Sequence, residues 1–227
     1  VQLTLIMKNS FLLITAITLL TACKNSPKAD AVETTEKQEP AKVSGENYSL
    51  DSASIITWTG SKPTQHHTGT FKLKDGKLYA ANNVLTGGTF IIDITSLTDT
   101  DIRDGADKAK LEGHLKSPDF FDAAKYPTAK FEITSVAPFV VDSSAGKTSV
   151  LENATNIIKG NLTIKDSTIN ISFPAKVTID ANSASAFANF NIDRTRWGIN
   201  YKGPGNPKDW IINKEVNIQL TLSASKN

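Results

Sequence analysis

Residues 168–179 read Thr-Ile-Asn-Ile-Ser-Phe-Pro-Ala-Lys-Val-Thr-Ile, and apolar side chains occupy every second position of this stretch. The alternation runs from Ile169 to Ile179, and Pro174 is the only interruption among the polar or small partners. Successive side chains of a β-strand point to opposite faces of the sheet. The stretch therefore predicts a strand with one face in an apolar core and one face in water.

The same period of two recurs on both sides of this stretch. Alternating apolar positions occur at Phe90, Ile92 and Ile94, at Ala129, Phe131 and Ile133, at Phe190 and Ile192, and at Val216, Ile218, Leu220 and Leu222. Asp75-Gly76 and Lys165-Asp166-Ser167 lie between such runs and are expected to form hairpin turns. Many antiparallel strands of this kind close into a barrel or pack as a sandwich.

Residues 101–126 break the alternation and predict a helical insertion. Apolar and polar positions from Ala106 to Leu115 follow helical spacing, and Ser117-Pro118 is expected to end the helix. A helix inserted among barrel strands is expected across one end of the barrel, as a plug or lid. The aromatic pair Phe120 and Phe121 is expected in a short turn that follows.

Composition excludes several functions. The formal net charge is +2, from 25 basic and 23 acidic residues, which argues against nucleic-acid binding. Cys23 is the single cysteine, so neither an internal disulfide nor a cysteine–histidine metal cluster is expected. His66 and His67 are expected on opposite faces of a strand, so their rings cannot chelate one metal ion together. No nucleophile, metalloprotease or nucleotide motif is present, so we expect no catalytic residue, no metal and no cofactor.

The first 22 residues have the layout of a secretory signal peptide. A lysine at position 8 is followed by a short apolar run from Phe11 to Leu20 and by Thr21-Ala22-Cys23. Residues 11–22 would span roughly 18 Å as a helix, against about 30 Å of bilayer hydrocarbon, so the run is too short to cross a membrane. Leu20-Thr21-Ala22-Cys23 also resembles the bacterial lipobox, which implies a lipid anchor on Cys23. The alternative is an ordinary secreted protein with a chance cysteine.

Residues 23–46 are expected to form the lipidated cysteine and a flexible linker. Lys, Glu, Ala, Thr, Pro and Ser dominate residues 24–46, and no aromatic residue occurs there. Such a segment buries too little apolar surface to offset the entropy lost on ordering. A helix over residues 30–38 is the alternative, although it has no apolar stripe. The remaining residues, 47–227, are expected to fold as one barrel domain.

Three stretches carry a resemblance to a known family. Residues 114–127, His-Leu-Lys-Ser-Pro-Asp-Phe-Phe-Asp-Ala-Ala-Lys-Tyr-Pro, resemble the signature of the YceI-like family. Residues 159–165 resemble its Gly-x-Leu-Thr strand, and residues 190–199 resemble its Arg-x-x-Trp-Gly element. The resemblance covers nearly all of residues 47–224. One departure is Asp166-Ser167-Thr168, where the family commonly has Gly-Val-Thr in a hairpin.

The resemblance implies an all-β fold: an extended, antiparallel, eight-stranded, lipocalin-like β-barrel with a short helical insertion. It also implies binding of a long isoprenoid chain, such as a polyprenyl phosphate or a quinone tail, and no enzymatic activity. With the lipobox, it places the protein in a bacterial cell envelope, periplasmic and lipid-anchored to the outer membrane, for storage, transport or stress protection. A homodimer is allowed. The alternatives are a hydrolase of unknown type and a structural envelope lipoprotein with a filled core.

Parity along the strands selects the candidate ligand-binding residues, which would surround an isoprenoid or other long-chain amphiphile. An eight-stranded barrel has room inside for one small ligand, but a core filled by side chains has the same pattern. The candidates are His67, Phe71, Leu73, Phe90, Ile92, Ile94, Phe131, Ile133, Leu162, Ile171, Phe173, Phe190, Ile192 and Arg194, with Ile164 on the same face.

Two polar members of this set have alternative interpretations. Arg194 shares parity with Phe190 and Ile192, so its guanidinium could contact a diphosphate or a carbonyl. It could instead form an internal ion pair with Asp93 or Asp193. His67 shares parity with Phe71 and is expected either as a hydrogen-bonded core residue or as a head-group contact.

Overall fold

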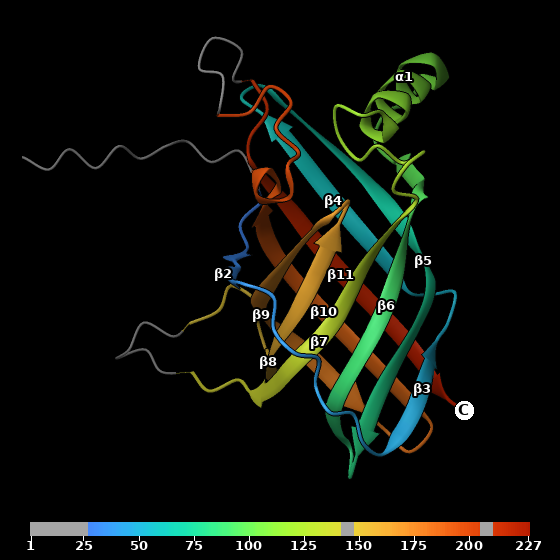
Figure 1. Ribbon diagram of the computed structural model, residues 1–227, viewed down its shortest axis with the longest axis vertical. Helices are drawn as coiled ribbons and strands as arrows, with labels where there is room; N and C mark the ends of the chain where they lie inside the picture. Colours follow the sequence, from blue (N-terminus) through green and yellow to red (C-terminus); the bar gives the residue numbers. More distant parts are fainter. Residues whose placement is uncertain (1–26, 142–147, 205–210) are drawn as a thin grey trace, which may run out of the picture.

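The computed structural model describes residues 27–141, 148–204 and 211–227, and its strands wrap into a barrel (Figure 1). The long strands are β5 (Gln65–Ala81), β6 (Val84–Asp99), β7 (Thr128–Pro138), β8 (Asn156–Ile164), β9 (Ser167–Ile179), β10 (Ser183–Asp193) and β11 (Glu215–Lys226). Two shorter strands, β3 (Glu46–Leu50) and β4 (Ile55–Lys62), both pair with β11 and β5, so together they fill one strand position.

Antiparallel pairing runs from β5 through β10 to β11 and returns through β3 and β4 to β5, which gives eight positions. The predicted all-β, eight-stranded barrel is therefore confirmed. The ladder is short at one place, because β9 and β10 pair over only four residues, Ala184–Phe187 against Lys176–Ile179. This short ladder is called the β9–β10 seam below.

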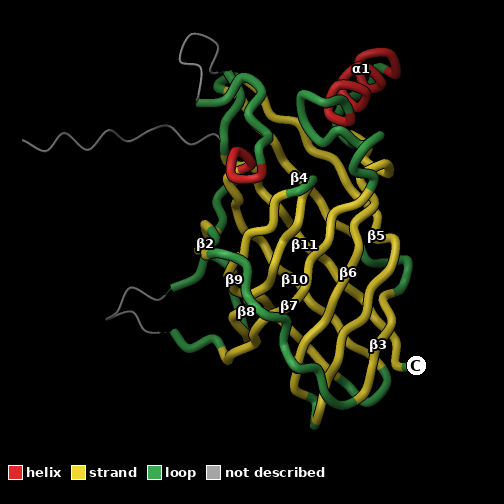
Figure 2. Tube along the Cα trace, in the orientation of Figure 1, coloured by secondary structure: helices red, strands yellow, loops and turns green. Residues whose placement is uncertain are grey.

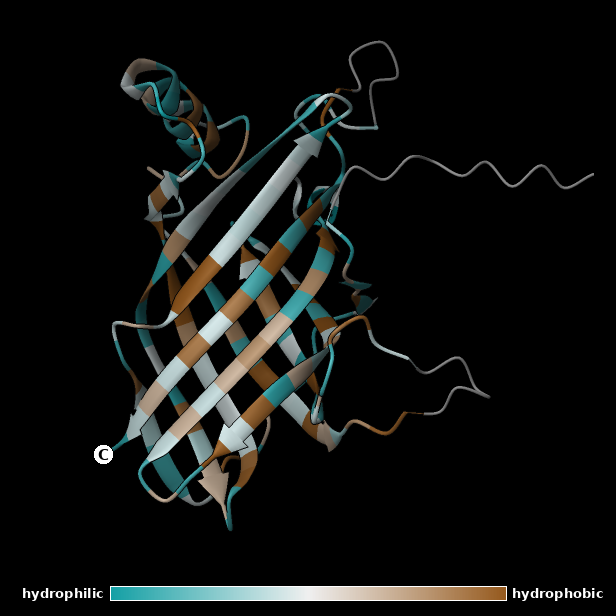
Figure 3. Cartoon of the chain, turned by 180° about the vertical axis from the view of Figure 1, so that it is seen from behind, coloured by the Kyte–Doolittle hydropathy of each residue, from teal (hydrophilic) through white to brown (hydrophobic). Residues whose placement is uncertain are grey.

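The barrel closes because its strands alternate in hydropathy (Figure 3). Inward side chains such as Phe90, Ile92 and Ile94 on β6 are buried, whereas their neighbours on the outer face are partly exposed. One core cluster joins all the long strands with Trp197 and Phe120. The alternating stretch around Phe173 is β9, as its pattern predicts.

One predicted turn is correct and one is wrong. Lys165-Asp166 joins β8 to β9, and Lys165 adopts a left-handed backbone with a φ of 56°. The turn predicted at Asp75-Gly76 lies instead inside β5, beside a register shift between Leu73 and Asp75. The actual turn follows at Asn82 and Asn83, with φ values of 52° and 60°. A bulge and a turn share glycine and aspartate as signals, so the local sequence does not separate them.

Residues 27–46, called the strap below, lie along the outside of the barrel (Figure 2). Within the strap, β1 (Asp30–Ala31) pairs in parallel with β10, and β2 (Glu33–Thr35) pairs antiparallel with β9. Further on, the backbone N–H of Ala41 donates to the carbonyl oxygen of Ile133 at 3.0 Å. Both expectations for these residues, a flexible spacer and a helix, are therefore wrong for the described part. Strand addition uses backbone hydrogen bonds and needs little apolar surface.

The predicted helical insertion is α1 (Gly105–Lys116), which lies at one end of the barrel (Figure 1). Asp104 caps its first turn by accepting from the N–H groups of Ala106 and Asp107, and the helix ends at Ser117. A short 3-10 helix, η1 (Arg194–Trp197), lies at the same end. In the described ranges, no helix has the length and apolar content needed to cross a bilayer.

Candidate functional site: an apolar cavity in the barrel

The barrel encloses a cavity of about 700 Å³ that opens at the end where α1 and η1 lie. Its wall is mainly apolar. Four phenylalanines from β6, β7, β9 and β10 form a connected series, with ring centroids 5.1 Å apart for Phe90–Phe131, 5.8 Å for Phe131–Phe173 and 4.2 Å for Phe173–Phe190. A cavity of this size and lining suits one long apolar ligand.

Most of the candidates selected by strand parity line the cavity. The candidates that line the cavity are His67, Phe71, Phe90, Ile92, Ile94, Phe131, Leu162, Phe173, Phe190, Ile192 and Arg194, with Ile164. Ile133 and Ile171 are buried, but they pack in a filled part of the core and are not on the wall. Leu73 also lies off the wall, half-buried beside the register shift in β5.

Sequence reasoning missed wall residues on two further strands and in the loop after η1. Ile56 and Trp58 on β4 line the cavity, as do Val216, Ile218 and Leu220 on β11. The β11 positions had a visible alternation and could have been included. Tyr201 and Ile199, from the loop after η1, had no such signal.

The mouth of the cavity is formed by α1 and the segments around it. Leu111, His114 and Leu115 of α1 border the cavity, so the helix lies at the barrel end as expected for a lid. The His114 ring makes edge contacts with Phe120, at 5.1 Å between centroids, and with Tyr201, at 4.8 Å. These rings connect the helix to the loop after η1 across the mouth.

Three lysines lie near this opening. Lys62 is the last residue of β4, Lys110 is on α1 and Lys202 is in the loop after η1, and all three border the cavity. The Nζ atom of Lys202 lies 5.7 Å from the centre of the Tyr201 ring. Lysine side chains therefore border the mouth, in contrast to the apolar wall deeper in the barrel.

Arg194 is almost fully buried, and its guanidinium donates to four backbone carbonyls. Nε donates to Asn213 at 3.0 Å, Nη1 to Ile199 at 2.5 Å, and Nη2 to both Tyr201 and Ile212 at 3.1 Å. Neither alternative from the sequence describes this arrangement, because Asp193 instead contacts Lys214 Nζ at 3.1 Å. Burial lowers the pKa of Arg194, although the charge of Asp193 opposes this. Arg194 therefore holds the loop at the mouth.

Trp58 supplies an unsatisfied donor on the wall. Its side chain is buried at 7% exposure, and Nε1 has no hydrogen-bond partner among the described residues. Trp197 differs, because its Nε1 donates to the carbonyl of Leu162 at 3.0 Å. An oxygen atom of a bound molecule is the kind of acceptor that Trp58 lacks.

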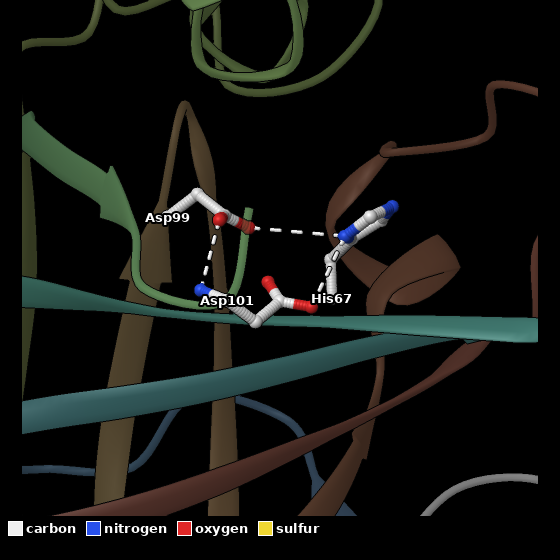
Figure 4. Close-up of side chains that lie close together, drawn as sticks. All are labelled: His67, Asp99 and Asp101. Carbon is white, nitrogen blue, oxygen red and sulfur yellow. Dashed lines mark hydrogen bonds and ion pairs between the residues drawn. The ribbon is translucent and has the colours of Figure 1, made fainter. Parts of the chain in front are cut away.

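His67 borders the cavity and also faces two carboxylates (Figure 4). Its Nδ1 lies 3.4 Å from Asp101 Oδ2 and 3.9 Å from Asp99 Oδ2, and it makes no hydrogen bond. Asp99 caps the turn that follows β6, because its Oδ1 accepts from the N–H groups of Asp101 and Ile102.

The predicted lipid anchor lies outside the described residues, because Cys23 precedes the first described residue, Pro27.

The fold and the cavity define the lipocalin-like class of β-barrels, which enclose one apolar compartment with an open mouth. Within that class, the chain belongs to the YceI-like domain family, whose model matches residues 48–224.

Solved structures share this fold. BcnA of Burkholderia cenocepacia is 20% identical, with a TM-score of 0.57 over 77% of this chain and 99% of that one. A polyisoprenoid-binding domain from Saccharophagus degradans, implicated in plant cell wall breakdown, is 19% identical, with a TM-score of 0.56 over 79% of this chain and 98% of that one. No curated protein matches the chain.

Proposed function

We propose that the protein binds one amphiphilic isoprenoid lipid, a polyprenyl phosphate or a quinone, with its tail in the barrel. The observation that carries this proposal is the apolar cavity of about 700 Å³, which a filled structural core would not contain. The polyisoprenoid-binding domain from Saccharophagus degradans has the same fold, which supports the choice of ligand class. The proposed role is binding without catalysis.

The tail and the head group would contact different residues. The four connected phenylalanines and their aliphatic neighbours would surround the tail, and apolar burial of about 25 cal/mol per Å² would supply most of the affinity before association costs. The head group would lie at the mouth, near Lys110 and Lys202, and Trp58 Nε1 is an unsatisfied donor on the cavity wall. Arg194, expected from the sequence to contact the head group, would act through the loop that it holds.

Lipid extraction from the purified protein, followed by mass spectrometry, tests the ligand class. A stoichiometric isoprenoid is the expected result, and a protein that neither retains nor binds isoprenoids while the cavity is intact would contradict the proposal. Turnover of an ester or phosphate library would favour the hydrolase alternative.

A variant with a blocked cavity provides a sharper test. Ala129 on β7 lines the cavity, whereas its neighbour Lys130 lies on the outer face. We expect Ala129→Trp to lose the isoprenoid and Lys130→Trp to keep it, because the same ring is added inside the barrel in one variant and outside it in the other. Equal lipid content in both variants would place the ligand elsewhere.

We also propose that the protein acts in a bacterial cell envelope, as a lipoprotein anchored through Cys23. The signal-peptide layout of residues 1–22 and the lipobox-like residues 20–23 support this location. A diacylglyceryl anchor buries many CH₂ groups at about 0.8 kcal/mol each, which is enough for stable membrane attachment.

A further inference from the structure

His67, Asp99 and Asp101 form a compact group near the rim of the barrel (Figure 4), and of these three only His67 also borders the cavity. His67 comes from β5, Asp99 is the last residue of β6, and Asp101 follows two residues later. One ligand atom from each side chain lies within 4.8 Å of the other two. Across the described ranges, this is the only group of three such side chains with that spacing.

Two atoms that face the centre of this group have unsatisfied hydrogen-bonding capacity. Asp99 is 0% exposed, and its Oδ2 has no hydrogen-bond partner although Oδ1 accepts two backbone bonds. His67 Nδ1 is also buried without a hydrogen-bond partner. The two atoms face each other and are joined by a dashed line in Figure 4. Their separation is 3.9 Å, which is too long for a hydrogen bond. Buried polar atoms normally have a partner, so this pair indicates a missing one.

We propose that His67, Asp99 and Asp101 bind a divalent first-row transition-metal ion, with Zn²⁺ as the best fit. Zn²⁺ takes imidazole nitrogen and carboxylate oxygen at about 2.0–2.2 Å, which places tetrahedral ligand atoms about 3.3–3.5 Å apart. The Nδ1–Asp101 Oδ2 distance of 3.4 Å already has this value, and the Nδ1–Asp99 Oδ2 distance of 3.9 Å is about half an ångström longer. An oxygen of each carboxylate lies within 4.8 Å of the other, so binding would also draw the two carboxylates together. An imidazole ligand selects against Mg²⁺ and Ca²⁺, which prefer oxygen.

Three protein ligands leave at least one coordination position for water. Asp101 is 39% exposed at its side chain and His67 is 20% exposed, so an ion reaches the site from solvent. Two carboxylates and a neutral imidazole would give the ion a net charge near zero, which favours its partial burial. A bound ion would also join the end of β6 to the segment that leads into α1, because Asp99 accepts from Ile102 just before that helix.

The competing account is a protonated His67 held between the two carboxylates, which needs no metal. In that account His67 Nδ1 and Asp99 Oδ2 form an ion pair at 3.9 Å without a hydrogen bond, so the buried Oδ2 atom still lacks a donor. The two accounts differ in whether Zn²⁺ binds at these residues.

Isothermal titration of the metal-free full-length chain with Zn²⁺ tests the site. We expect one equivalent bound with a dissociation constant in the micromolar range or tighter. His67→Gln and Asp101→Asn should each weaken this binding by about tenfold or more, as expected for the loss of a ligand. The matched control is His66→Gln, because His66 is the exposed neighbour on the opposite face of β5. Cys23 is common to all four proteins, so any ion that it binds is the same background in each.

A second measurement on the unmodified chain does not depend on the folding of any variant. In NMR spectra, one equivalent of Zn²⁺ should shift the ring signals of His67 and leave those of His66 and His114 in place. Absence of a His67 shift, or Zn²⁺ titrations that are the same in the His67 and His66 variants, would overturn the proposal and support the ion-pair account.

Discussion

Arg194 has a structural role that its position on an apolar strand face does not reveal. Its planar guanidinium donates hydrogen bonds to backbone carbonyls of the segment after η1 and of the segment before β11. These two segments contribute Ile199, Tyr201 and Ile212 to the cavity lining. One buried cation therefore determines the shape of the mouth.

Replacing Arg194 should destabilise the protein and weaken every ligand alike. We expect Arg194→Ala to lower the free energy of unfolding by about 3 kcal/mol, because several buried carbonyls lose a charged donor. Affinity for an anionic polyprenyl phosphate and for a neutral quinone of equal tail length should fall by similar factors, as measured by fluorescence titration. Urea denaturation gives the stability change.

Arg196, in the same short helix but exposed, is the matched control. Arg196→Ala should change neither stability nor affinity appreciably. A loss confined to the anionic ligand in Arg194→Ala would show instead that the guanidinium contacts the head group, as strand parity alone suggests.

The lowered pKa of Asp193 should make the stability of the protein depend on pH. Burial favours its neutral form, but hydrogen bonds from the Thr195 hydroxyl and the charge of Lys214 prevail and lower its pKa. A lowered folded-state pKa adds stability that is fully present above the unfolded value of about 3.9 and is lost as pH falls through the folded value. We expect Asp193→Asn to cost about 1 kcal/mol at pH 7 and to reduce the loss of stability below about pH 4.

Urea midpoints at neutral and acidic pH measure this effect. Asp75→Asn, at an exposed position of β5, is the control and should retain the acid dependence of the unmodified protein. An Asp193→Asn variant with an unchanged acid slope would show that Asp193 does not contribute to it.

Among the larger elements, the strap is bound to the barrel by strand pairs and also by one buried side chain, that of Asn161. Asn161 on the outer face of β8 is 2% exposed. Its amide donates to the carbonyl of Gln38 at 2.7 Å and accepts from the Gln38 N–H at 3.0 Å, as a neighbouring strand would. Asn170 of β9 donates to the same amide oxygen at 3.0 Å.

We expect Asn161→Ala to loosen the strap without opening the barrel. The variant should lose about 2 kcal/mol of stability, because the Gln38 bonds are removed and the Asn170 amide loses an acceptor. Hydrogen exchange followed by mass spectrometry should show faster exchange over residues 30–44, with β5 to β7 unchanged. Lys159→Ala, at an exposed position of the same strand, should leave exchange in the strap as it was. Unchanged exchange in Asn161→Ala would mean that the strand pairs of β1 and β2 suffice.

The sequence predicted the elements whose structure depends on the pattern of apolar side chains. It did not predict the elements that are held mainly by backbone hydrogen bonds. Alternation identified β9, β6 and β11 because their inward positions are buried apolar residues. The strap lacks such a pattern. Its composition indicated a linker, because composition contains no information about a hydrogen-bond partner elsewhere in the chain, such as the side-chain amide of Asn161. His67, Asp99 and Asp101 meet through the register of β5 with β6, which contains shifts that local sequence does not specify.

For the whole molecule, the prediction concerns its location in the cell. Cys23→Ala should move the protein from the membrane fraction to the soluble periplasmic fraction, because the acyl chains that would hold it in the bilayer are missing. Fractionation followed by a carbonate wash measures the change. Lys24→Ala keeps the cysteine and should remain in the membrane fraction. A Cys23→Ala variant that stays in the membrane fraction after the wash would contradict a lipid anchor at this residue.

The pairing of the strap beside the β9–β10 seam determines how far the barrel could lie from a membrane. The carbonyl of Pro27 accepts from Asn191, three residues before Arg194 and the mouth. Because the chain is fixed to the barrel from that point, only four residues would separate Cys23 from the barrel. That segment would span at most about 14 Å when extended. A spacer running to residue 46 would give several times that reach. An anchored barrel would therefore lie with its opening close to the lipid surface. A long isoprenoid tail could then span this distance, with one end still in the bilayer while the other end is already in the cavity.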